Sequence, residues 1–260
     1  MKKAIDIFED ENFIECLKYN TYDDKDNRIK VFDKNNEIIK KNIDKITKID
    51  CLGYWIVNIK GISIFKNLKT LNLFANKVKN LPKEISELIN LEILNLIANK
   101  IKKLPDNIGK LTNLKELHLY WNQIQTLPEE IWKLKNLEIL NLSINQLQSL
   151  SNEIWRLCKL KKLYLSNNKL QRLPIEILKL GKLKSVWLNN AFNLSNLEQA
   201  PNELFYILKQ LEKKKVLEDD DLEYLEEKVY PILKEKIKEK YRITNLKQIK
   251  DNFNLDNFSF

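Results

Sequence analysis

Glycine and histidine are scarce in this chain of 260 residues, which contains four glycines and a single histidine. A loop that cradles phosphate needs glycines so that backbone amides can approach the ligand, and neither G-x-x-x-x-G-K-[ST] nor G-x-G-x-x-G occurs. The lone histidine, His118, cannot supply a zinc site, and the sequence pattern places no serine or cysteine nucleophile beside it. These absences predict a protein that is not an enzyme and that holds no metal or cofactor.

Cysteine is also rare, and its three copies, Cys16, Cys51 and Cys158, are scattered without any C-x-x-C pair. We interpret each as a small apolar side chain in a reduced protein, rather than as a redox or metal-binding group. No run of about 18 apolar residues occurs, so no transmembrane span is expected, and the N-terminal stretch MKKAIDIFEDENF lacks the apolar segment of a secretory signal. The expectation is a cytoplasmic protein, with export by a non-classical route left open.

What the sequence does contain is a strict repeat of fixed period over positions 68–182. The five regular blocks begin at Leu68, Leu91, Leu114, Leu137 and Leu160. Each follows the frame L-x-x-L-x-L-x-x-N-x-(L/I/V)-x-x-L-P-x-x-I-x-x-L-x-x, with few departures. Apolar and polar residues alternate at its start, as in a short strand, and the asparagine follows where the chain must turn. After the Leu-Pro step, the I-x-x-L segment predicts a helical or 3₁₀ turn.

A single block cannot bury its own leucines, so neighbouring blocks must stack and bury them together. The frame resembles that of the leucine-rich repeat family in its 23-residue form, as in bacterial proteins and in intracellular proteins related to Ras-binding scaffolds. This resemblance implies an α/β solenoid, or horseshoe, with a parallel sheet on the concave side and short helical or 3₁₀ turns on the convex side. It also implies use mostly in protein–protein contact. In the fourth block Ser151 stands where the others have proline, and we expect a looser turn there.

The chain is expected to divide into three parts. Residues 1–45 lie outside the repeat and would form an N-terminal cap from a short helix over 10–18 and a small hairpin over 28–40. Residues 46–196 would form the solenoid, because degenerate repeats extend the regular blocks at both ends. Residues 197–260 would form a helical cap, since an open solenoid end exposes leucines and strand edges. The alternatives are a docking element at the N-terminus and an oligomerisation or effector segment at the C-terminus.

Helical spacing of apolar residues marks the C-terminal part, beginning with residues 203–215. The acidic run at 219–221 would start a second helix through capping and through its interaction with the helix dipole. Pro231 is expected either to kink that helix or to open a new one, because proline lacks the backbone N–H.

Positive charge is concentrated in the repeats. Residues 46–196 carry a net charge of +12, against −1 for residues 1–45 and −2 for residues 197–260. The lysines that follow the asparagine turns of two adjacent blocks are Lys77, Lys79, Lys100, Lys102 and Lys103. A solvated rim is the simplest explanation, and attraction to an acidic partner or an anionic surface is the alternative. Nucleic acid is disfavoured, because the lysines flank the turns while the aromatic residues lie on the strands, and the repeats hold only Arg156 and Arg172.

The side chains between the strand leucines point away from the core, so the fold does not require particular residues there. An apolar side chain gains little there unless something covers it. The candidate partner-binding residues, which we name the sheet-face band, are Phe74, Ile97, His118, Tyr120, Trp121, Tyr164 and Trp187. Aromatic side chains supply much of the binding energy at interface centres, and mutual packing of neighbouring strand residues is the alternative. On the convex side, Trp132 and Trp155 occupy equivalent positions and are expected to stack.

Together these patterns predict a monomeric, non-enzymatic scaffold that binds another protein on its concave face. One alternative is binding of nucleic acid or of an acidic surface through the basic solenoid. Another is a repeat-domain effector that acts on a host or signalling protein such as a small GTPase, which follows from the family resemblance alone.

Overall fold

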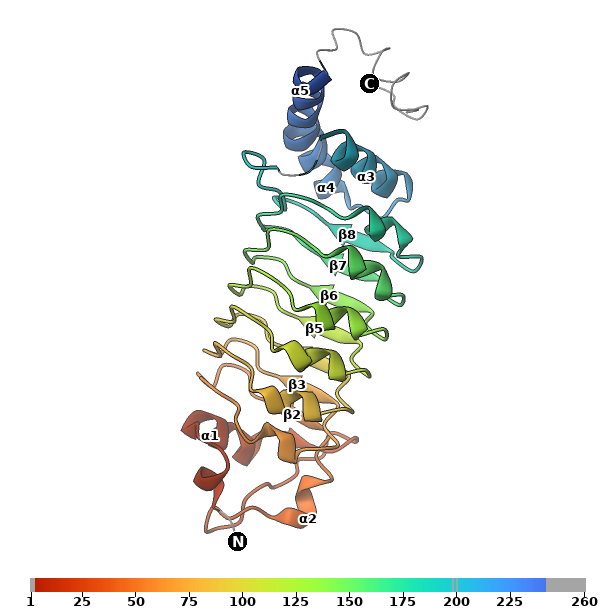
Figure 1. Ribbon diagram of the computed structural model, residues 1–260. Coiled ribbons are helices and arrows are strands. Elements are labelled where there is room, and N and C mark those ends of the chain that lie inside the picture. Colours follow the sequence, from red (N-terminus) through yellow and green to blue (C-terminus); the bar gives the residue numbers. More distant parts are fainter. Residues whose placement is uncertain (1–2, 198, 200, 242–260) are drawn as a thin grey trace.

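The computed structural model describes residues 3–197, 199 and 201–241, which form one elongated stack of coils (Figure 1). In the described chain, a sheet of eight strands follows the stack in the order β1 to β8. The strands are β1 Thr21–Tyr22, β2 Lys48–Asp50, β3 Thr70–Asn72, β4 Ile93–Asn95, β5 Glu116–His118, β6 Ile139–Asn141, β7 Lys162–Tyr164 and β8 Ser185–Trp187. β1 is antiparallel to β2, and each later pair is parallel. The predicted repeat solenoid is therefore confirmed.

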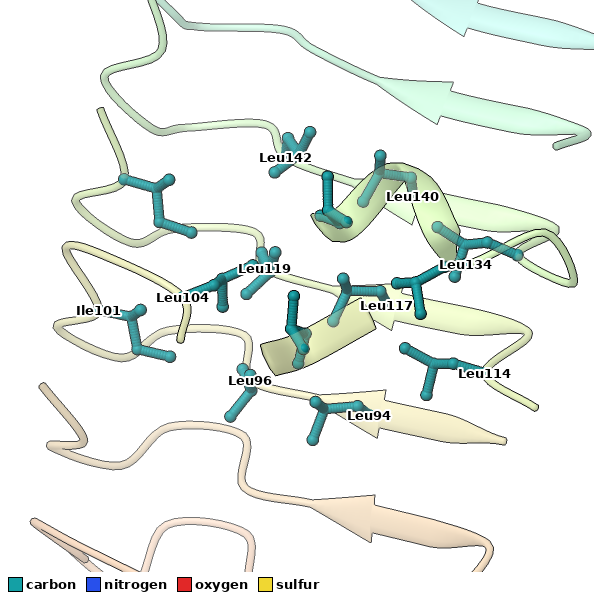
Figure 2. Packing of buried hydrophobic residues seen from close by; sticks show 14 of the residues in the cluster. Leu94, Leu96, Ile101, Leu104, Leu114, Leu117, Leu119, Leu134, Leu140 and Leu142 are labelled. Atoms are coloured by element: carbon teal, nitrogen blue, oxygen red, sulfur yellow. The ribbon is translucent and has the colours of Figure 1, made fainter. Parts of the chain in front are cut away.

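Leucines of neighbouring coils stack on one another to form the core (Figure 2). Leu94, Leu117 and Leu140 lie opposite one another on β4, β5 and β6, and all are fully buried. Each occupies the same place in its own block, so the fixed period of the repeat puts equal side chains in register along the stack. Burial of leucine contributes roughly 1.5–3 kcal/mol per side chain, and only the stacking of coils makes that burial possible.

Short 3₁₀ helices form the other side of the coils, as the I-x-x-L segments predicted. They are η2 Ile62–Ile64, η3 Lys83–Glu87, η4 Asp106–Lys110, η5 Glu129–Lys133, η6 Asn152–Arg156 and η7 Ile175–Lys179. The looser turn expected at Ser151 is not found, because its backbone angles (φ −69°, ψ 150°) match those of Pro128 (φ −68°, ψ 146°). The Ser151 hydroxyl accepts a hydrogen bond from the Glu153 amide at 3.2 Å, which caps η6 in place of the proline.

The asparagine of each frame closes the predicted turn with hydrogen bonds to two coils. Asn99 donates to the carbonyl of Leu73 at 2.9 Å in the preceding coil and to that of Leu96 at 3.1 Å in its own. Its Oδ1 accepts from the Val78 amide at 3.0 Å. The same arrangement recurs at Asn76, Asn122, Asn145 and Asn168. These buried amides satisfy backbone groups that the bend would otherwise leave unpaired.

An N-terminal cap of short elements covers the first coil. It consists of η1 Ala4–Asp6, α1 Glu11–Tyr19, β1 and α2 Lys40–Ile43, and Asp10 is the N-cap of α1, with its Oδ1 3.0 Å from the Phe13 amide. The predicted helix is therefore present one residue later than expected. The predicted hairpin is reduced to a single bridge between Phe32 and Ile38, while β1 was not anticipated.

The structure corrects the prediction of isolated, reduced cysteines. Cys16 of α1 and Cys51 of the first coil form a disulfide, with Cα atoms 5.6 Å apart. That separation lies within the range that disulfides require, roughly 4.4–6.8 Å. Because disulfides persist in oxidising compartments, the cysteines no longer support the expectation of a cytoplasmic protein. Cys158 is an exposed free thiol.

Helices cover the C-terminal end of the stack. They make up the described part of the predicted C-terminal cap. They are α3 Pro201–Lys213, α4 Asp219–Tyr224, the π-helical turn η8 Leu225–Val229 and α5 Tyr230–Tyr241. The π-helical turn ends at Val229, two residues before Pro231, near the point where a kink or a new helix was predicted. The carbonyl of Val216 accepts a hydrogen bond from the Val186 amide at 2.6 Å, which pairs the outer edge of β8. Residues 242–260 lie outside the described residues.

One hydrophobic core runs from Ala4 to Ile237, so both caps share buried contacts with the solenoid. The boundaries at residues 45/46 and 196/197 stay predictions. In the described chain, none of the helices has both the length and the apolar character that a membrane span requires.

Candidate partner-binding surface

The sheet-face band lies along strands and turns whose leucines point into the core. Leu71, Leu94 and Leu117 are fully buried, whereas the residues that alternate with them on β3, β4 and β5 are only half-buried. Six members of the band are half-buried, namely Phe74, Ile97, His118, Tyr120, Tyr164 and Trp187. Trp121 differs, because 61% of its surface is exposed. The alternation of strand side chains thus gives these residues their access to solvent.

Asparagines on the strands place the aromatic and aliphatic residues that follow them. The Oδ1 atoms of Asn72 and Asn95 accept hydrogen bonds from the amides of Phe74 and Ile97, at 3.0 and 3.1 Å. Asn72 also donates to Asp50 on β2 at 2.8 Å. The sequence pattern treated these strand positions as free for contact, but here they hold the chain as it leaves the sheet.

The two ends of the sheet-face band differ. Tyr164 of β7 and Trp187 of β8 stack with ring centroids 3.8 Å apart and planes inclined by 9°. Burial, together with the negative charge of Glu218, raises the pKa of the Tyr164 hydroxyl. Among the described residues, Phe74 and Tyr120 stack on no other ring. Mutual packing therefore explains the C-terminal end of the band and leaves its other end unexplained.

His118 pairs with a carboxylate and not with a nucleophile. Its Nε2 lies 2.9 Å from Oε2 of Glu116 on the same strand, and both side chains are partly exposed. A histidine held by one carboxylate on an open sheet is a polar contact residue or, when protonated, a weak ion pair. In residues 3–197, 199 and 201–241, no three His, Cys, Asp or Glu side chains gather as a metal site would require.

Ion pairs neutralise part of the positive charge at the residues just before the strands. Lys115 bonds to Glu92 at 2.6 Å, and this hydrogen bond raises the pKa of the lysine. Lys161 bonds to Glu138 at 2.6 Å, and this hydrogen bond lowers the pKa of the carboxyl. In the described part of the chain, none of the five lysines after the asparagine turns forms an ion pair. The unpaired positive charge therefore lies along the turn edge of the coils.

Trp121 differs from the rest of the sheet-face band because it is near Trp55, a residue that the repeat frame did not identify as a candidate. It lines a groove of about 460 Å³ together with Trp55 of the first coil. Trp55 is 63% exposed. The first repeat is one residue short and carries Tyr54 at the asparagine position, so its columns do not align with those of the regular blocks. The signal that the sequence offered for Trp55 was a tryptophan next to a predicted turn.

The convex tryptophans do not stack as predicted. Trp132 is 1% exposed, whereas Trp155 is 44% exposed and lies under the guanidinium of Arg156 at 5.5 Å. No ring contact joins the two tryptophans within the described chain. The convex side is thus a less regular surface than the repeat implied.

Comparison with solved structures finds the same repeat fold in several bacterial proteins. The leucine-rich repeat protein LIC12759 of Leptospira interrogans is 36% identical over 52% of this chain and 41% of its own, with a TM-score of 0.46. The functional domain of InlJ from Listeria monocytogenes is 22% identical over 71% of this chain and 37% of its own, with a TM-score of 0.58. Internalin C2 of Listeria monocytogenes is 22% identical over 70% of this chain and 75% of its own, with a TM-score of 0.59.

This chain therefore spans less than half the length of the first two of these structures. No curated protein matches it in sequence. The family model described as a leucine-rich repeat region matches residues 106–259, which is more than half of the chain. With the 23-residue frame, the parallel sheet and the stacked leucines, this match shows that the chain belongs to the leucine-rich repeat family.

Proposed function

We propose that this protein is a non-enzymatic, monomeric scaffold that binds a partner protein through its sheet-face band. Leucine-rich repeat proteins are generally protein-interaction modules, which supports the coarser part of this proposal. The observation that carries the finer part is the group of half-buried apolar side chains on adjacent coils, Phe74, Ile97 and Tyr120. Such side chains gain free energy when a partner removes them from water.

The contact is centred on β3 to β5 and the turns that follow them. Tyr164 and Trp187 already satisfy each other by stacking, so their burial by a partner would add less. Phe74, Ile97 and Tyr120 lack such a ring partner, and interface centres are rich in aromatic side chains of this kind. His118 and Glu116 supply a polar margin beside Tyr120.

Site-specific photo-crosslinking in the native host tests this proposal. A photoreactive phenylalanine analogue replaces Tyr120 in one variant and Trp155 on the convex side in the other. The proposal expects a protein adduct at position 120 and none at position 155, because only the first lies in the sheet-face band. Equal capture at both positions, or none at 120, contradicts it. The identity of the adduct decides whether a small GTPase is the partner.

A second experiment separates contact from folding. The triple variant Phe74→Ala, Ile97→Ala, Tyr120→Ala should lose the captured partner, while Trp155→Ala keeps it. Circular dichroism and thermal unfolding of both variants show whether the coil survives. A partner that binds the folded triple variant with unchanged affinity rules out the sheet-face band.

A further inference from the structure

Two tryptophans face solvent at the turn edge of the coils, away from the sheet. Trp55 and Trp121 are each more than 60% exposed, although tryptophan is usually well buried. Between them lies the groove of about 460 Å³ introduced above. Besides the two tryptophans, its lining includes Ala75, Ala98, Lys77 and Lys100. The volume falls in the range of ligand sites, roughly 300–1,000 Å³.

Both tryptophans occupy left-handed backbone, with φ +63° at Trp55 and φ +57° at Trp121. A bulky residue is unfavourable there, at a cost of about 1–2 kcal/mol, and glycine or asparagine suits the position better. The backbone is left-handed at the position of Trp121 in each coil from Leu68 onward, where the other coils carry Ala75, Ala98, Ile144, Asn167 and Asn190. Exposed tryptophan at 121 therefore serves neither the turn nor the core. The left-handed turn is common to the coils, so the large exposed area of the two indole rings is what points to a binding role.

The Trp55 wall of the groove is held firmly by the N-terminal cap. Asp10, the N-cap of α1, accepts hydrogen bonds from the amides of Val57 and Asn58 through Oδ2, at 2.6 and 3.0 Å. The disulfide from Cys16 to Cys51 ties the same segment to α1. Because these contacts fix the loop on both sides of Trp55, the wall is formed before any ligand arrives, and little ordering entropy is lost on binding.

The floor of the groove is apolar, and its free polar groups are positively charged. Between the tryptophans the lining includes two small apolar residues, Ala75 and Ala98, which we call the alanine floor. The amides of Asn76 and Asn99 are already used by backbone groups of the coils. That leaves Lys77, Lys100 and the amide of Gln123. The Lys77 ammonium lies 3.9 Å from the centre of the Trp55 ring, and in the described chain neither lysine pairs with a carboxylate.

From this combination we infer that the groove between Trp55 and Trp121 binds an acidic peptide segment of a partner protein. One apolar side chain of the peptide lies between the two indole rings on the alanine floor. Flanking carboxylates pair with Lys77 and Lys100, and Lys79 and Lys102 of the same two coils extend the positive field. This site goes beyond the proposed function, because Trp121 alone of the sheet-face band lines the groove and the other lining residues lie outside the band.

Other ligand chemistries match the groove less well. Sugar hydroxyls need several hydrogen-bond acceptors, whereas lysine only donates and Gln123 offers one amide oxygen. Nucleic acid favours arginine and a long row of phosphate contacts, and neither Arg156 nor Arg172 lines this groove. Carboxylates next to one apolar anchor fit both the floor and the two lysines.

Fluorescence polarisation with a labelled synthetic peptide tests the inference. The probe has a central leucine flanked by aspartate and glutamate. We expect Trp55→Ala and Trp121→Ala each to weaken binding about tenfold, as loss of a central aromatic contact does. Lys77→Gln with Lys100→Gln should weaken it as well and reduce its dependence on salt. Replacing the peptide leucine by serine should abolish the aromatic contribution.

Asparagine variants separate binding from folding. Trp55→Asn and Trp121→Asn suit left-handed backbone, so each should fold at least as stably as the parent and still lose the peptide. Tyr120→Ala and Trp155→Ala are the matched aromatic controls outside the groove and should bind normally. Retention of peptide affinity by Tyr120→Ala also makes this site independent of the sheet-face band, so failure of one proposal leaves the other standing.

Three results would overturn the inference. The first is peptide affinity that does not change in the folded Trp55→Asn, Trp121→Asn double variant. The second is equal binding of a peptide in which lysine replaces every acidic residue. The third is tighter, tryptophan-dependent binding of an oligouridine or of phosphatidylserine vesicles, which would assign the groove to a nucleic acid or to a membrane surface.

Discussion

The carboxylate of Asp221 lies 2.6 Å from the backbone nitrogen of Leu188 and holds the C-terminal helices on the last strand. The same oxygen accepts a hydrogen bond from the Asn189 amide at 2.7 Å. Only 1% of the side chain is exposed. Burial raises the pKa of this carboxyl above its usual value of 3.8, although the amide hydrogen bonds act in the opposite direction. One buried acid thus seals the end of the sheet.

The raised pKa of Asp221 predicts how this cap responds to pH. Between pH 3.8 and the folded pKa, the folded protein binds more protons at this residue than the unfolded chain does. The contribution of Asp221 to the free energy of unfolding is therefore complete below pH 3.8 and is lost as the pH rises through the folded pKa. Asp221→Asn keeps an acceptor and cannot titrate, so urea unfolding at a series of pH values should show this dependence removed.

Asp221→Ala is the companion variant. It leaves the amides of Leu188 and Asn189 without an acceptor and should lower the free energy of unfolding by about 2 kcal/mol. Equal stability of the alanine variant and the parent would contradict a sealing role.

Asn122→Ala should be strongly destabilising, by about 3 kcal/mol in urea unfolding, because its loss leaves several buried groups unpaired. The side chain donates to the carbonyls of Leu96 and Leu119 and accepts from the Ile101 amide at 2.9 Å, all in a buried turn. Removing it leaves these groups away from water without partners. Asn113→Ala is the control, since that exposed amide makes one bond, to the Ile89 carbonyl, and should cost less than about 1 kcal/mol. Similar losses in both variants would refute the distinction.

Reduction of the Cys16–Cys51 disulfide should weaken the N-terminal end. The bridge joins residues 35 positions apart, and a loop of that size corresponds to about 4 kcal/mol in the chain-entropy description. Hydrogen exchange with and without reductant should locate the loss in α1 and the first coils. Cys158→Ser leaves the bridge intact and serves as control. Finding three free thiols by mass spectrometry in protein purified without reductant would show that the bridge does not form.

Gly109→Ala tests how closely adjacent coils pack on the convex side. A Cβ at Gly109 would collide with the carbonyl oxygen of Glu130 in the next coil, so overpacking should cost about 1–3 kcal/mol in urea unfolding. Gly181→Ala is the matched control, because nothing lies within 4 Å of its added Cβ. That variant should be neutral or gain up to about 1 kcal/mol. Equal effects at both glycines would mean that the coils have room to move apart.

The repeat frame was sufficient to predict the coil. Leu94 lies opposite Leu117 of the next block, and Asn99 and Asn122 make equivalent hydrogen bonds in successive coils. The environment of one block therefore predicts that of the next. Sequence reasoning also found the half-buried group around Tyr120, because alternation on a strand determines which residues face solvent.

The remaining features depend on contacts that no period encodes. Cys16 meets Cys51 only because α1 folds back onto the first coil. Asp221 binds backbone amides, and because nearly every residue has one, the sequence does not indicate which amides it binds. Trp55 belongs to a groove whose opposite wall, Trp121, lies on a later coil. Positions like these become visible only when caps and coils are seen together.

Tyr120 and Trp121 are consecutive residues of the sheet-face band, and only Trp121 also lines the groove. The two proposed binding surfaces therefore meet at a single peptide bond. A folded partner with an adjoining acidic tail could occupy both at once, and the second contact would then be intramolecular. Linkage of this kind increases avidity by roughly 10²–10⁴ over either contact alone. Two surfaces of moderate affinity would then distinguish between partner proteins that have the same folded domain but different tails.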